Sequence, residues 1–171
     1  DMLAIARDLG AQVGPLRGGT VSIRAARLTT SAIPPELSSS IRGSILFASA
    51  LLVRTGTASV PRPGGDAIGR RRVDTHFHVF EALGAKLKVE RDGAGGTTIY
   101  TVRAPARGLR GNDIYLDEAS VTATENAIIA AAGARGRTVV ANAASEPHVQ
   151  RLCALLQSMG VRIEGVGSNV L

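Results

Sequence analysis

The chain has 171 residues, of which 44% are hydrophobic and 3% aromatic, so it can build one packed domain with an aliphatic core. Its formal net charge of +6 comes almost entirely from arginine. Few aromatic side chains are present to stack bases, so we expect small phosphate-bearing ligands rather than nucleic acid. Cys153 is the only cysteine, which excludes an intrachain disulfide and is typical of a reducing cytosol. The longest apolar run, residues 45–53, is too short to cross a membrane.

The two ends of the chain indicate a segment of a longer polypeptide. The sequence starts at Asp1 without a methionine or a signal peptide, and it stops on the apolar pair Val170-Leu171. We therefore expect a cytoplasmic protein, of which residues 1–171 form a single domain.

The first 60 residues are predicted to contain short helices and strands in alternation. A helix covers residues 1–10, and a hairpin follows over 12–24 around a Gly-Gly turn. A polar stretch leads to a first helical turn at Pro35. An apolar helix over 41–53 and a strand over 56–60 complete this half.

The second half begins with a glycine-rich loop, and the spacing of its apolar residues then predicts a helix from Val73 to Leu83. Strands over 85–90 and 97–103 form a hairpin, and a short strand covers 112–116. The capping-box pattern from Thr122 to Glu125 predicts a helix over 123–134. A strand over 136–141, a helix from Pro147 to Gly160 and a strand that begins over 161–164 follow.

A repeat is visible in the way three predicted helices end. Gly10, Gly84 and Gly160 each stand between the end of a helix and the start of a strand, at intervals of about 75 residues. The repeating unit is helix, strand, helix, strand, strand. Units of this kind predict one α/β domain with internal pseudo-symmetry, in which helices pack together behind sheets.

The segment 63–76 concentrates the chemistry of the chain. It reads Pro-Gly-Gly-Asp-Ala-Ile-Gly-Arg-Arg-Arg-Val-Asp-Thr-His, so glycines, one carboxylate and three arginines share a single loop. Arginine forks bind phosphate and carboxylate groups, and this composition favours an anion-binding loop with its own acid, Asp66. The glycine spacing matches a P-loop, but Arg70-Arg71 replaces the required Lys-Ser/Thr pair. The alternative is a flexible surface loop with solvated charges.

Four segments together resemble the UDP-N-acetylglucosamine 1-carboxyvinyltransferase family. They are the loop 63–76 followed by a helix that ends in Leu-Gly-Ala, the stretch 41–45 (Ile-Arg-Gly-Ser-Ile), the stretch 120–126 (Ser-Val-Thr-Ala-Thr-Glu-Asn) and the stretch 142–147 (Asn-Ala-Ala-Ser-Glu-Pro). They occur in the order and spacing of that family. The resemblance runs through nearly the whole chain.

The resemblance implies a two-domain fold in which each domain is an inside-out α/β barrel of three βαβαββ-type units. This chain would be most of one domain, and the second domain of the same enzyme would be its partner. The implied reaction transfers the enolpyruvyl group of phosphoenolpyruvate to the 3′-hydroxyl of UDP-N-acetylglucosamine in peptidoglycan precursor synthesis. It needs no cofactor and no metal, and the isolated segment would be inactive.

The resemblance also implies roles for individual residues. Asp66 stands where most members have a cysteine and would be the general acid, which requires a raised pKa, whereas the neighbouring arginines would lower it. Without a thiolate at this position we expect insensitivity to epoxide drugs that alkylate the cysteine. The implied phosphate ligands are Arg42 and Arg71, for which the alternative is a surface salt bridge. The implied uridine and diphosphate contacts are Val73, Asp74, Ser120 and Val121.

The chain departs from the family at three positions near these contacts. Arg72 replaces a usual proline, Glu118 a usual lysine and Thr122 a usual glycine. These exchanges leave open a related enolpyruvyl transferase that acts on another nucleotide sugar, and also a non-catalytic anion-binding domain.

The remaining candidates favour structural roles. His76 and His78 lack a third ligand for a metal, so His76 is interpreted as a hydrogen-bonding residue between loop and helix. Cys153 lies on an apolar helical stripe and is predicted to be in the core. Glu146 before Pro147 is a helix N-terminal charge, with a ligand role as the alternative that the resemblance offers.

Overall fold

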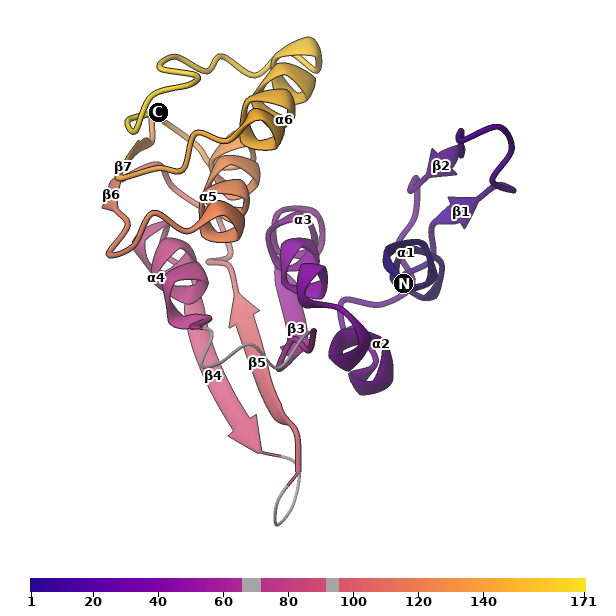
Figure 1. Cartoon of the computed structure of the whole chain (residues 1–171). Helices are drawn as coiled ribbons and strands as arrows, with labels where there is room; N and C mark the ends of the chain where they lie inside the picture. Colours follow the sequence, from indigo (N-terminus) through magenta and orange to yellow (C-terminus); the bar gives the residue numbers. More distant parts are fainter. Residues whose placement is uncertain (66–71, 92–95) are drawn as a thin grey trace.

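The computed structural model describes residues 1–65, 72–91 and 96–171, and Figure 1 shows how their helices and strands are arranged. The helices of this described part are α1 (Met2–Asp8), α2 (Pro35–Ser40), the 3-10 helix η1 (Arg42–Leu46), α3 (Phe47–Thr55), α4 (Asp74–Ala82), α5 (Val121–Ala132) and α6 (Pro147–Ser158). The strands are β1 (Gln12–Val13), β2 (Ile23–Arg24), β3 (Thr57–Pro61), β4 (Lys86–Arg91), β5 (Thr98–Arg103), β6 (Asp113–Tyr115) and β7 (Val139–Ala141). The fold is therefore mixed α/β, as the sequence predicts.

The described strands form three separate sheets and no closed barrel. β1 and β2 make an antiparallel hairpin, and β6 pairs with β7 in parallel. The largest sheet has the antiparallel order β3-β5-β4, in which Val102 of β5 lies between Ala58 of β3 and Leu87 of β4. In Figure 1 the β4–β5 hairpin projects away from the helices.

A core of aliphatic side chains joins the helices to the central sheet. α5 contacts α3, α4 and α6, while α3 packs on β3 and α4 on β4. Ile45, Leu51, Val60, Phe80 and Val102 are all fully or almost fully buried in this core. Burial of such side chains stabilises the fold by about 1.5–3 kcal/mol each. No helix in the described part of the chain combines the length and the apolar character that a bilayer span requires.

The three repeated glycines have the same local structure. Gly10, Gly84 and Gly160 have φ of +100°, +94° and +97°, a conformation that glycine adopts without a Cβ clash. The residue after each glycine donates a hydrogen bond to the carbonyl five residues earlier: Ala11 to Ala6 at 2.9 Å, Ala85 to Phe80 at 2.9 Å and Val161 to Leu156 at 3.0 Å. This is the Schellman helix end, and it confirms the predicted common ending of the three helices.

The helix predicted over 41–53 is wrong as a single element. α2 ends at Ser40, Ile41 is extended with φ −150° and ψ 135°, and η1 precedes α3. Two serines act at the end of α2, where Ser39 Oγ donates to the carbonyl of Glu36 at 3.0 Å and Ser40 Oγ to that of Leu37 at 2.9 Å. Such local bonds compete with continuation of a helix.

Two further boundaries differ from the prediction. The N-cap of α5 is Ser120, whose Oγ accepts a bond from the Ala123 amide at 3.3 Å, and Thr122 lies inside the helix. Residues 161–164 form no strand in the described structure. The chain turns at Gly165 and pairs with β7 only at its end, where Leu171 and Val140 exchange two backbone hydrogen bonds of 2.8 and 2.9 Å. The other predicted elements are confirmed to within a few residues.

Candidate functional site

A groove of about 1090 Å³ opens between the start of α4, the β4–β5 hairpin and the loop after β6. Its apolar wall includes Phe77 and Tyr100, whose rings stack with centroids 4.6 Å apart. Its polar side carries both signs of charge. The lining residues are Arg62, Arg72, Val73, Asp74, Thr75, Phe77, His78, Glu81, Leu87, Val89, Tyr100 and Asp117.

Arg72 joins two carboxylates at the polar side of this groove. Its Nε donates to Asp74 Oδ1 at 2.9 Å and its Nη2 donates to Asp74 Oδ2 at 2.6 Å. The same Nη2 also donates to Asp117 Oδ2, and Thr75 Oγ1 donates to Asp117 Oδ1 at 3.0 Å. We call these four residues the Arg72 cluster. It connects the loop after β6 to the first turn of α4.

The electrostatics of the Arg72 cluster follow from these contacts. Hydrogen bonds from Arg72 lower the pKa of Asp74, and bonds from Thr75 and Arg72 lower that of Asp117. The two carboxylates raise the pKa of Arg72. All three groups are therefore charged near neutral pH, and they remain accessible, with 43% of the Arg72 side chain and 48% of the Asp117 side chain exposed.

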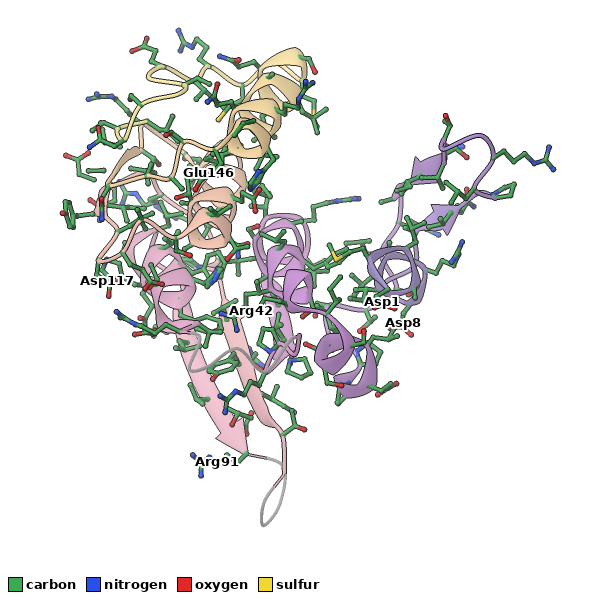
Figure 2. All side chains as sticks on the ribbon, in the orientation of Figure 1. Asp1, Asp8, Arg42, Arg91, Asp117 and Glu146 are labelled. Atoms are coloured by element: carbon green, nitrogen blue, oxygen red, sulfur yellow. The ribbon has the colours of Figure 1, made fainter. Side chains whose placement is uncertain are left out.

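Arg42 lies against both flanks of the loop 66–71. Its Nη2 donates to the carbonyl oxygen of Arg72, the first residue described after that loop. Before the loop, a Cβ at Gly65 would be only 3.1 Å from Arg42 Cβ, and Gly65 has φ +100°. Figure 2 labels Arg42 on the connection between α2 and α3. The predicted phosphate ligand is therefore in contact with the segments that start and end the predicted active-site loop.

Buried serines fix the segment that leads into this loop. Ser38 Oγ donates to the carbonyl of Pro61 at 2.8 Å, and Ser44 Oγ donates to the carbonyl of Ser38 at 3.1 Å. The Gly64 amide donates to the same Ser38 carbonyl at 3.0 Å. A Cβ at Gly64 would lie 1.7 Å from the carbonyl oxygen of Ser39, so this close approach requires glycine.

His76 lies inside α4, not in the loop, and forms a buried network with α5. Only 1% of His76 is exposed. Asn126 Nδ2 donates to His76 Nδ1 at 2.8 Å, so the ring proton is on Nε2, which is 3.3 Å from Thr122 Oγ1. Asn126 Nδ2 also donates to the carbonyl of Ile45 at 3.2 Å, and its Oδ1 accepts from the Ser49 amide at 3.3 Å. We call this set the His76 network.

The His76 network holds its histidine neutral. Burial, and then the positive charge of Arg42, lower the pKa of His76 to about 4, against a smaller opposing effect of Asp74. The predicted hydrogen-bonding role of His76 is confirmed. His78 is exposed on the groove, and the described residues contain no group of three side chains that could hold a metal ion.

The predicted site residues fall into four sets. Val73 and Asp74 line the groove, whereas Ser120 and Val121 are at the start of α5, outside the groove lining. Arg42 lies beside the loop. Asp66 and Arg71 fall outside the described residues, so their predicted roles stay predictions.

The two remaining candidates lie elsewhere. Glu146 is the N-cap residue of α6, and Figure 2 shows it well away from Arg42 and Asp117. Cys153 is fully buried with Ile128 and Val149, which confirms its core role. Burial raises the pKa of its thiol, as expected for an unreactive cysteine.

Sequence reasoning missed Asp117 and the stacked pair Phe77–Tyr100. The sequence did contain an indication for Asp117, which directly follows the predicted strand 112–116 and precedes a helix. Ligand sites in α/β proteins gather at the carboxyl ends of strands. Phe77 and Tyr100 are 23 residues apart, and no sequence pattern predicts that their rings stack. Their pairing depends on how α4 packs against the sheet.

Comparison with known proteins identifies the family of this chain. The profile of the EPSP synthase (3-phosphoshikimate 1-carboxyvinyltransferase) family matches residues 1–170. The chain belongs to this family. Among curated relatives, the UDP-N-acetylglucosamine 1-carboxyvinyltransferase of Treponema denticola is 49% identical over 170 residues, and that of Bradyrhizobium diazoefficiens is 45% identical. Both alignments cover 99% of this chain, and the resemblance predicted from the four motifs is confirmed.

Solved structures of the family share its fold with this chain. The enolpyruvyl transferase NikO from Streptomyces tendae superposes with a TM-score of 0.73 at 23% identity and covers 98% of this chain. EPSP synthase from Acinetobacter baumannii superposes with a TM-score of 0.64 at 21% identity. The chain spans about 38% of the length of the Treponema denticola relative and 37% of that of the Bradyrhizobium diazoefficiens relative.

Proposed function

We propose that this chain is part of an enolpyruvyl transferase that converts phosphoenolpyruvate and UDP-N-acetylglucosamine to the enolpyruvyl ether and phosphate, in peptidoglycan precursor synthesis. The observation that carries the proposal is the identity of 49% to relatives that bear the name of this activity, over 99% of the chain. Identity to the superposed EPSP synthase is only 21%. The acceptor is therefore the UDP-sugar rather than 3-phosphoshikimate.

The groove and its surroundings support this choice of substrates. Phosphoenolpyruvate and a UDP-sugar both carry phosphoryl groups, which guanidinium groups bind with fixed geometry. Arg42 touches the segments on both sides of the loop that carries Asp66 and Arg71. Val73 and Asp74 line the groove, and Ser120 and Val121 begin the helix that follows Asp117. We assign the uridine and diphosphate contacts to these four residues.

The reaction proceeds by addition and elimination. The acceptor hydroxyl loses its proton to a base as its oxygen adds to C2 of phosphoenolpyruvate, and C3 gains a proton from the general acid, which gives a tetrahedral ketal. Loss of phosphate and of a proton from C3 then gives the enolpyruvyl ether. Asp66 supplies the proton, and Arg42 and Arg71 stabilise the charge on the phosphate. Three of the five N–H donors of Arg72 are directed to Asp74 and Asp117, so these two carboxylates orient its guanidinium.

The domain architecture of the enzyme is part of the same proposal. Residues 1–171 would be part of one domain, an inside-out α/β barrel of repeated βαβαββ-type units, and the three Schellman ends support the repeat. A second domain of the same enzyme would close the substrate cleft, and the enzyme would act in the cytoplasm without a metal or other cofactor.

Phosphate release from phosphoenolpyruvate by the full-length parent protein tests the function. We expect release that requires UDP-N-acetylglucosamine and that falls at least about a hundredfold in Asp66→Ala, because a positioned acid contributes about 10²–10⁴-fold. If Asp66→Ala releases phosphate as fast as the wild type, the proposed reaction stands but Asp66 is not its general acid. Absence of release would contradict the proposal and leave an anion-binding domain.

An alkylation experiment tests the chemistry of position 66 separately. The full-length protein is treated with an epoxide that labels active-site cysteines, and Asp66→Cys serves as the matched control. We expect labelling and inhibition only in the variant. Covalent labelling at Asp66 would contradict this prediction.

A further inference from the structure

The side chain of Arg72 is held in one orientation but is only partly used. A guanidinium has five N–H donors. The Nε donor is directed to Asp74, and the two Nη2 donors are directed to Asp74 and Asp117. Among the described residues, no acceptor bonds to Nη1. Two donors of a fixed guanidinium therefore remain for another acceptor.

The position of these donors indicates the kind of acceptor. Arg72 lines the groove and keeps 43% of its side chain exposed. Its backbone is also fixed, because Arg42 donates to its carbonyl oxygen. A guanidinium whose orientation is set in advance loses less entropy when it binds a phosphate or carboxylate.

Arg72 offsets part of the negative charge at this lip of the groove. One guanidinium and two carboxylates give the cluster a net charge of −1, and without Arg72 the same lip of the groove would carry −2. Asp74 and Asp117 would then repel phosphate. Arg72 consequently offers two donors and offsets one of the two negative charges that would oppose phosphate binding.

We propose that Arg72 is a phosphate-binding residue of the groove, with its Nη1 group donating to a phosphoryl oxygen of a nucleoside diphosphate. The inference rests on the proposed function, and it assigns a contact that the family resemblance does not supply, since a proline usually occupies this position. Asp74 and Asp117 act as positioning residues that hold the guanidinium toward the ligand.

Binding measurements on the full-length protein test this contact with three probes: UDP, inorganic pyrophosphate and uridine. We expect Arg72→Ala to weaken UDP and pyrophosphate binding about tenfold. Uridine binding should fall less, because Arg72 affects uridine only through the orientation of Asp74. Arg72→Lys keeps the charge but loses the fork, so it should weaken UDP binding by about threefold. Arg107→Ala is the matched control, since Arg107 is an exposed arginine at a separate pocket and its removal changes the net charge equally.

The outcomes separate this inference from the proposed function. Equal UDP affinity in wild type and Arg72→Ala would overturn the inference, as would an equal loss of uridine binding or an equal effect of Arg107→Ala. Turnover of phosphoenolpyruvate by the same protein would still support the proposed function in that case. Conversely, Arg72-dependent binding of UDP and pyrophosphate without any turnover would uphold the inference and contradict the enzymatic proposal.

Discussion

Two polar clusters connect α4 to the segment 117–126, and they differ in burial. The Arg72 cluster is half exposed and consists of charged groups together with one hydroxyl. The His76 network is buried and neutral, and Asn126 uses both Nδ2 and Oδ1 within it. Desolvation penalises unpaired charge, so the buried cluster holds neutral, paired groups. The exposed cluster keeps its charges and has donors left for a ligand. The comparison assigns stability to the buried network and binding to the exposed one.

Removal of Asn126 should give the largest change in stability. Asn126→Ala leaves the Ile45 carbonyl, the Ser49 amide and His76 Nδ1 without their partner in the core. We expect the free energy of unfolding to fall by about 3 kcal/mol, measured by chemical denaturation. Asn112→Ala is the matched control, because both side-chain bonds of Asn112, to the Ala82 carbonyl and from the Asp113 amide, are exposed and their loss should cost less than about 1 kcal/mol. Equal losses of unfolding free energy in the two variants would contradict a special contribution of the buried His76 network to stability.

The neutral state of His76 predicts a pH dependence of nearly the same size. A histidine with a pKa of 6.5 when unfolded and about 4 when folded binds its proton more weakly in the native state. Its contribution is complete above pH 6.5 and is lost as the pH falls from 6.5 to 4, by about 3 kcal/mol in total. The measurement is the difference in unfolding free energy between wild type and His76→Gln over this window. Identical pH profiles for the two proteins would contradict the neutral, buried histidine.

The bond between Thr122 and His76 should have a smaller effect. Thr122→Val removes the Oγ1 that lies 3.3 Å from His76 Nε2 and leaves that N–H unpaired. We expect a loss of about 1 kcal/mol in thermal or chemical unfolding. Thr122→Ser keeps the hydroxyl and should retain most of the stability, so an equal loss in both variants would point to packing of the methyl group instead.

Changes in the Arg72 cluster should have the smallest effect on folding. Arg72→Ala is expected to leave the unfolding midpoint within experimental error, because exposed ion pairs contribute little and salt screens them. The same variant should weaken UDP binding, as described above. A clear loss of stability without a loss of affinity would reverse the roles of the two clusters.

The sequence predicted those features that depend on local pattern. The three glycine helix ends and the β4–β5 hairpin follow from residues close together in the chain. The 3-10 helix η1 was missed because the apolar pattern of residues 41–53 is equally compatible with one continuous helix. The cap of α5 was misplaced by two residues, because Ser120 and not Thr122 accepts the bond that caps the helix, from the Ala123 amide.

Only part of the candidate site could be predicted from the sequence. Arg42, Val73 and Asp74 came from motifs, and the structure places them beside the loop or in the groove. The contact of Arg72 with Asp117 spans 45 residues and depends on how the loop after β6 packs against α4. No local sequence pattern predicts a contact between residues so far apart in the chain.

The choice of acceptor tests the central proposal most directly. Phosphate release from phosphoenolpyruvate should be measured with the full-length protein and either UDP-N-acetylglucosamine or 3-phosphoshikimate. The proposal predicts release with the UDP-sugar and none above background with 3-phosphoshikimate. Release with 3-phosphoshikimate alone, or with neither acceptor, would contradict it.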